Sequence, residues 1–144
     1  MRKTSYGFLR AVVKARHVLL VSRLVKMELH ETPDLDERTH IYRRMADASP
    51  RNVPESSRVL KLRDELLREG RWGANRFEDM LHVAYTIACQ ADALVTWDEG
   101  DLARSRTRRV VESVCRRMGV RAPKIGIPED VARWLNINLS KKTR

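Results

Sequence analysis

The stretch FEDMLHVAYTIACQADALVTWD, residues 77–98, decides how this chain folds. Its first half places apolar residues at every third or fourth position, which predicts an amphipathic helix. Residues 93–97 then form a short apolar run rich in strand-formers, which predicts a strand covered on both faces. Asp79 lies near the start of the helix, and Asp98 ends the strand. Ligands of parallel α/β sheets bind outside the carboxyl ends of the strands, so Asp98 is a candidate functional residue.

Helices and short apolar strands alternate along the rest of the chain. This alternation predicts an α/β domain with a short parallel sheet between two layers of helices. Strands are expected at 18–22, 92–97 and 123–127, with a very short further one at 52–53. Helices are expected at 1–16, 23–31, 35–48, 56–69, 77–88 and 104–118, and from Pro128 onward. Residues 1–135 are expected to form a single domain, and residues 136–144 a basic C-terminal tail.

The 144 residues carry a formal net charge of +10, which is unevenly spread. Residues 1–30 hold seven basic and one acidic side chain, residues 31–100 ten and fourteen, and residues 101–144 twelve and four. Two basic ends therefore flank an acidic middle. Such a basic surface is typical of proteins that bind nucleic acid, and RNA is the expected partner. The alternatives are a basic protein without a charged ligand, or a basic face that meets an acidic protein.

Composition also bears on the compartment. No apolar run approaches the roughly 20 residues that cross a bilayer, so no membrane association is expected. Cys89 and Cys115 each lie in an apolar helical pattern, which indicates buried, reduced thiols and a cytoplasmic location. The arginine-rich, acid-poor N-terminus also resembles a transit peptide, but residues 18–22 are better explained as a strand.

Three carboxylates on separate predicted elements form the candidate site. Glu28 shares a helical row with the apolar Leu24, and a carboxylate buried there needs a partner, either an arginine or a metal ion. Glu28, Asp79 and Asp98 could meet above the carboxyl edge of the sheet. Clustered carboxylates cannot all stay ionised without a cation. Their hard oxygen atoms suit Mg²⁺ or Mn²⁺.

The order of these motifs resembles the PIN-domain family of metal-dependent nucleases. The segments DMLHVA (79–84) and LVTWD (94–98) resemble the second half of that domain. The segment VLLVS (18–22), with Glu28 six residues after it, resembles its second strand and acidic helix, and IGIPED (125–130) resembles its last strand and final helix. A PIN domain opens with a central strand that ends in an aspartate, and no such strand precedes Ser22. We therefore expect an N-terminally truncated PIN-like fold, because the natural chain begins upstream or because the gene has decayed.

The resemblance implies a Mg²⁺- or Mn²⁺-dependent endoribonuclease that cleaves RNA phosphodiesters by a metal-activated water. In that scheme Glu28, Asp79 and Asp98 are the catalytic residues and metal ligands. The protein would be the toxin of a toxin–antitoxin pair, with an antitoxin protein as partner. His82 would assist proton transfer or be structural, and Thr96 would hold a carboxylate or serve only as a strand residue.

Two other functions remain open from the sequence. A truncated or degenerate PIN-like protein would bind RNA or a protein without cleaving. A basic helical DNA-binding module would explain the charge, but not the buried strand that ends in Asp98. A gap beside the truncated sheet would also invite pairing with a strand of a second copy, as a homodimer.

A run of arginines follows the candidate site. Arg104, Arg106, Arg108 and Arg109 lie on or beside the exposed side of the predicted helix 104–118. Such a run is often only a solvated face, but beside an acidic pocket it favours phosphate contact. Trp72 lies between glycines just before the helix that begins at residue 77. It is expected either to cover the core or to stack on a nucleic-acid base.

Overall fold

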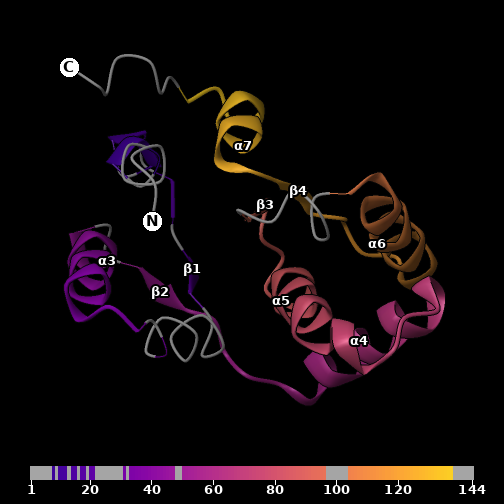
Figure 1. The fold of residues 1–144 in the computed structure, drawn as a ribbon. Helices are drawn as coiled ribbons and strands as arrows, with labels where there is room; N and C mark the ends of the chain where they lie inside the picture. Colours follow the sequence, from indigo (N-terminus) through magenta and orange to yellow (C-terminus); the bar gives the residue numbers. More distant parts are fainter. Residues whose placement is uncertain are drawn as a thin grey trace. The chain divides into compact units, whose positions relative to one another are not determined.

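The structure, a computed structural model, describes residues 8, 10–12, 14–15, 17–18, 20–21, 31, 33–47, 50–96 and 104–137 (Figure 1). The chain divides into two compact units. One unit comprises Met1–Val53 with Pro128–Arg144, and the other comprises Pro54–Ile127. Each unit is described by itself. Within the described ranges, no helix is long and apolar enough to cross a membrane.

The first unit contains a short parallel strand pair. Strand β1 (Leu20–Val21) pairs with β2 (Arg51–Asn52), and helix α3 (Leu35–Asp47) lies between them in sequence. Asp34 begins α3, because its Oδ1 accepts the backbone N–H groups of Asp36 and Glu37 at 2.9 and 3.2 Å. Helix α7 (Pro128–Trp134) opens with a proline, whose fixed φ and missing N–H suit a first helical turn. The predicted helix that carries Glu28 lies outside the described residues.

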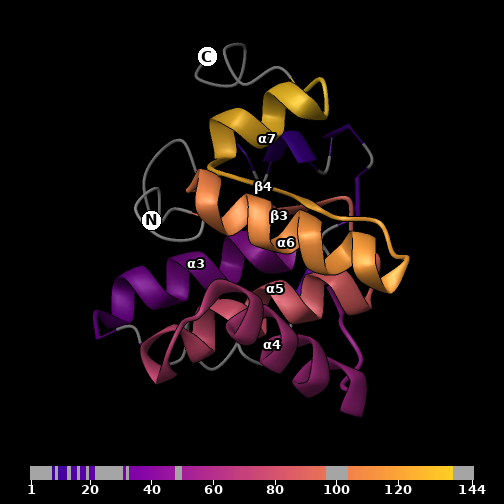
Figure 2. The ribbon, with the colours of Figure 1, turned by 90° about the vertical axis from the view of Figure 1, so that its right-hand side faces the viewer.

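The second unit holds a strand–helix–strand motif and two further helices (Figure 2). Its strands β3 (Ala93–Val95) and β4 (Lys124–Gly126) are parallel, with Leu94 opposite Ile125. Backbone hydrogen bonds from Lys124 N–H to the Asp92 carbonyl and from Thr96 N–H to the Gly126 carbonyl extend this pairing at both ends. The helical elements are α4 (Ser57–Gly70), the 3₁₀ turn η1 (Ala74–Arg76), α5 (Phe77–Ala88) and α6 (Ser105–Met118).

Apolar side chains from α4, α5, α6 and β4 form the core of the second unit. The side chains with at most 1% of their surface exposed are Leu62, Leu66, Met80, Val83, Ala84, Ile87, Val111, Val114, Cys115 and Ile125. Burying each of the larger aliphatic side chains contributes about 1.5–3 kcal/mol. Burial also raises the pKa of the Cys115 thiol, so this cysteine stays protonated and inert at neutral pH. The apolar period that predicts helices at 56–69, 77–88 and 104–118 is thus confirmed.

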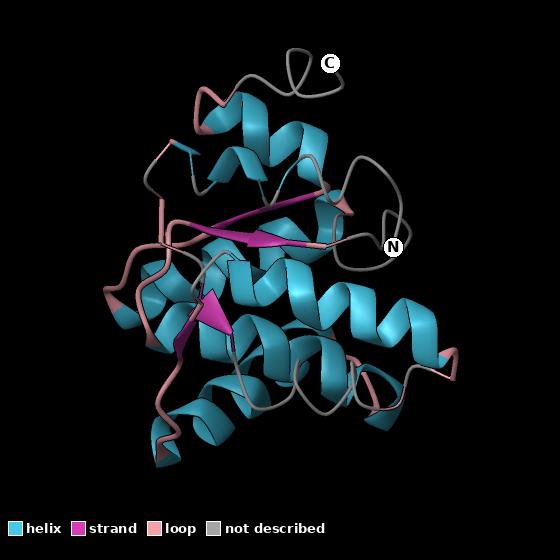
Figure 3. Ribbon diagram, turned by 90° about the vertical axis from the view of Figure 1, so that its left-hand side faces the viewer, coloured by secondary structure: helices cyan, strands magenta, loops and turns pink. Residues whose placement is uncertain are grey.

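The mixed α/β class predicted from the alternating pattern is also confirmed. The strands of the described ranges form two separate two-stranded parallel sheets, β1–β2 and β3–β4 (Figure 3). Each strand has only two or three residues. Such short strands carry few hydrogen bonds, so the packing of the helices determines most of the stability of each pair.

The ends of α4 and α6 differ in the residue that takes the left-handed position. Helix α6 ends in a Schellman motif with Gly119 at φ 70°, as its sequence predicts. Helix α4 ends in the same motif, but Arg71 takes the left-handed position at φ 54° and Gly70 precedes it. The reason is the indole of Trp72, which lies against the α-carbon of Gly70. A Cβ atom on Gly70 would lie 2.2 Å from Cε3 of Trp72.

We predict that Gly70→Ala lowers the free energy of unfolding by about 1–3 kcal/mol, because the added methyl group forces the indole away from its place on the core. The matched control is Gly73→Ala, whose methyl group would meet only Asn75 Oδ1 at 3.6 Å. We expect that substitution to change stability by less than about 1 kcal/mol. Urea unfolding of the two variants measures both values. An equal effect of the two substitutions would contradict the tight contact at Gly70.

Candidate functional site

The structure describes part of the predicted site. Asp79, His82 and Thr96 lie in the second unit, as do the four predicted arginines of α6. The predictions for Glu28 and Asp98 concern residues outside the described ranges. The site is therefore built from the start of α5 and from the carboxyl end of β3.

Asp79 lies in the first turn of α5, where the helix dipole favours a negative charge. Its Oδ2 accepts a hydrogen bond from Nε of Arg76 at 3.1 Å. The pair is largely shielded from water, since the Arg76 and Asp79 side chains are 13% and 27% exposed. A guanidinium group therefore compensates the charge of this carboxylate.

Arg76 also connects Asp79 to two other helices. Its Nη2 lies 3.4 Å from the hydroxyl oxygen of Thr107, a buried residue in the first turn of α6. Its Cζ lies 4.5 Å from the centre of the Trp72 ring, directly after α4. We call Trp72, Arg76, Asp79 and Thr107 the Arg76 junction, because one guanidinium group links the ends of three helices. The spacing of three residues between Arg76 and Asp79 is a weak signal for this junction in the sequence.

The indole of Trp72 is closely surrounded. It packs on the core of the second unit and lies against Gly70 as well as Arg76. Arg106 approaches the same ring at 5.8 Å, while its Nη2 donates a hydrogen bond to the Gly70 carbonyl at 2.7 Å. These contacts favour the packing interpretation of Trp72 over a role as a stacking platform for bases.

Thr96 directly follows β3, and His82 lies on α5. Thr96 is 7% exposed and continues the pairing of β3 with β4 through its backbone N–H. Asp98, which follows it by two residues in the sequence, lies outside the described residues. His82 is half-buried on α5, one turn after Asp79, and its carbonyl accepts the Thr86 hydroxyl at 2.8 Å.

The donor chemistry of the predicted ligand set suits a divalent cation. Glu28, Asp79 and Asp98 would offer only carboxylate oxygens, which hard cations such as Mg²⁺ and Mn²⁺ prefer. Among the described residues, however, no three His, Cys, Asp or Glu side chains gather into a group that could hold a metal. Asp79 alone of the set is described, and Arg76 occupies it. The described part of the chain therefore contains one of the three predicted metal ligands.

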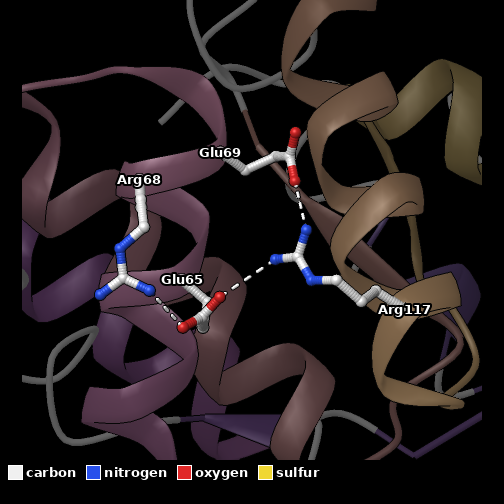
Figure 4. Close-up of polar contacts among 4 residues, drawn as sticks. All are labelled: Glu65, Arg68, Glu69 and Arg117. Carbon is white, nitrogen blue, oxygen red and sulfur yellow. Dashed lines mark hydrogen bonds and ion pairs between the residues drawn. The ribbon is translucent and has the colours of Figure 1, made fainter.

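Two arginines of α6, Arg106 and Arg117, bond to helix α4. Arg106 bonds to Gly70, and Arg117 bonds to α4 through Glu69 Oε1 at 2.5 Å and Glu65 Oε2 at 3.0 Å (Figure 4). The hydrogen bond with Glu69 is the main cause that raises the pKa of Arg117. Glu65 also accepts a bond from Arg68 of its own helix at 2.6 Å. Arg106 and Arg117 thus hold α6 against α4.

The comparisons with known proteins add no further assignment. No protein-family model, no curated protein and no solved structure gives a significant match to this chain.

We predict that Arg76 and Asp79 stabilise the fold jointly, with a coupling free energy of about 1–2 kcal/mol. A double-mutant cycle with Arg76→Gln, Asp79→Asn and the double variant measures this value in urea unfolding. The physical reason is that either single substitution leaves a mostly buried charge without its counterpart. Additive effects, within about 0.3 kcal/mol, would contradict the pair.

Proposed function

We propose that the chain is a PIN-like, metal-dependent endoribonuclease with a three-layer α/β/α fold. The observation that carries this proposal is the placement of Thr96 at the carboxyl end of a parallel strand, two residues before Asp98. Substrates of parallel α/β folds bind at that end of the strands. The two strand–helix–strand orders, β1–α3–β2 and β3–α6–β4, support an α/β fold of this kind.

The connection between α5 and β3 is compatible with a site that Asp79 and Asp98 share. Helix α5 ends in a Schellman motif, with Gln90 at φ 58°, and β3 follows and contacts it. Asp79 and the strand that precedes Asp98 thus belong to consecutive elements that contact each other.

In this proposal Glu28, Asp79 and Asp98 hold Mg²⁺ or Mn²⁺. The chemistry that such a cation supplies when bound is activation of a water for attack on the phosphodiester and stabilisation of the leaving oxygen. Arg76 fixes the position of the Asp79 carboxylate through Oδ2, and its guanidinium group competes with the cation for that charge. Thr96 and His82 are supporting residues beside Asp98 and Asp79. The exposed arginines of α6 contact the phosphates of RNA.

The biological setting is part of the same proposal. By its resemblance to PIN-type toxins, the chain would act in the cytoplasm and be inhibited by an antitoxin protein. A second copy could pair with the sheet as a homodimer.

One observation favours a second candidate, a PIN-like protein that binds RNA without cleaving it. The ion pair with Arg76 compensates the charge of Asp79, so the start of α5 does not depend on a cation for its stability. Such a protein could keep its fold and its basic surface without a bound cation.

We predict that Asp98→Asn reduces Mn²⁺-dependent cleavage of single-stranded RNA by at least about 100-fold, because it removes a charge from the site. The matched control is Asp92→Asn at the opposite end of β3. Asp92 is exposed and pairs only loosely with Arg121, so its substitution should leave cleavage unchanged. Cleavage is followed on labelled RNA with Mn²⁺ and with EDTA.

The two candidates give opposite results in this assay. Cleavage that EDTA and Asp98→Asn both remove supports the nuclease. RNA that binds to the folded wild-type chain and stays intact in Mn²⁺ supports the second candidate. Equal cleavage by wild type and Asp98→Asn would contradict the proposed set of catalytic residues.

A further inference from the structure

Helix α6 presents its charged residues on two distinct sides. Arg106 and Arg117 are eleven residues apart, which is close to three full turns, so they share one flank. Both bond to α4. Arg109 and Arg116 are seven residues apart and share another row. Arginines on these two sides of α6 therefore have different surroundings.

The second row points away from the core. It consists of Ser105, Arg109, Glu112 and Arg116, all exposed. The buried residues of α6, Val110, Val111 and Val114 among them, lie on the opposite side of the helix. We call these four residues the outer row. Within the described part of the chain, the side chains of Arg109 and Arg116 form no hydrogen bond and no ion pair.

The composition of the outer row indicates what kind of partner fits it. It contains no aromatic or aliphatic side chain, whereas the centres of protein–protein interfaces are apolar and depend on aromatic anchors. Guanidinium groups match phosphate oxygens in pairs and lose little freedom when they bind them. The outer row is therefore suited to the phosphodiester backbone of a nucleic acid rather than to a protein.

The spacing of the two arginines fits such a chain. Seven residues of helix separate them by about 10 Å along the axis. A stacked nucleic-acid strand advances about 3.4 Å per nucleotide. Arg109 and Arg116 can therefore contact phosphates about three nucleotides apart. Arg104 and Arg108, which precede this pair, extend the positive charge toward the start of the helix, next to the Arg76 junction.

We propose that the outer row of α6, through Arg109 and Arg116, is the phosphate-contact surface for single-stranded RNA, and that Arg106 and Arg117 belong to the fold. The proposal rests on the proposed function for its choice of RNA as ligand. It divides the basic residues of one helix into a binding pair and a structural pair. Glu112 lies between the binding arginines and weakens their attraction for phosphate.

The test is the affinity of a fluorescein-labelled oligouridylate for the full chain, measured by anisotropy in EDTA over a salt series. EDTA prevents metal-dependent cleavage, so binding is read separately from catalysis. At 0.1 M salt, R109A/R116A should weaken binding about 20-fold, and the slope of log K against log salt should fall by about 1.4, since each single-strand contact contributes about 0.7. E112Q should strengthen binding. Both substituted positions are exposed, so the melting temperature should not change.

The matched control is R58A/K61A, which removes the same charge from exposed positions in the first two turns of α4. Arg58 and Lys61 precede Glu65, Glu69 and Gly70, which contact α6, by one turn of α4 or more. We expect less than about a two-fold loss of affinity for this variant. Equal losses in the two double variants would overturn the proposal, because they would mean attraction by net charge alone. Unchanged affinity in R109A/R116A, or no binding by the wild type, would also overturn it.

These outcomes are distinct from a failure of the proposed nuclease. A chain that binds RNA through Arg109 and Arg116 but never cleaves it contradicts only the catalytic proposal. A chain that cleaves RNA while R109A/R116A keeps full affinity contradicts only the outer row.

Discussion

The contact between the Arg76 guanidinium and the Asp79 carboxylate is the constraint on which the second unit depends. Arg76 lies between α4 and α5 and reaches Thr107 at the start of α6, so one side chain fixes the ends of three helices. Trp72 forms one wall of this contact and requires a glycine at position 70. Because the pair is mostly buried, neither charge is easily replaced. The candidate site and the fold therefore share a residue, Asp79.

The basic charge of this chain has two uses that its sequence does not separate. Arg117 joins α6 to α4 through hydrogen bonds with two glutamates. Arg106 donates a hydrogen bond to the last carbonyl of α4 and contacts the indole of Trp72. These arginines contribute to packing. The outer row of α6 makes no such contacts, and its charge is directed to solvent. A high positive charge alone would support any nucleic-acid binder, whereas the proposed division assigns binding to the outer row and packing to Arg106 and Arg117.

The sequence predicts most elements of the second unit, because each has a clear apolar period or a clear end. The helical spacing of Val110 and Val114 predicts α6, and Gly119 marks its end. The apolar run that precedes Thr96 predicts β3. The Arg76 junction could not be predicted, since its contacts to Trp72 and Thr107 depend on where three helices meet. Arg106 was predicted to contact phosphate with its neighbours, and only the position of α4 reveals that it is already bound. Strand β2 has two residues, which is too few for a period.

The most direct test of the central claim, that Asp79 belongs to a cation site as well as to the fold, is a calorimetric titration of the full chain with Mn²⁺. Wild type, Asp79→Asn and Arg76→Gln are compared after circular dichroism has shown that each is folded. The account predicts saturable binding to the wild type, none to Asp79→Asn, and tighter binding to Arg76→Gln, because the competing guanidinium group is gone. Folded wild-type protein that gives no heat with Mn²⁺, or Asp79→Asn that binds as wild type does, would contradict it.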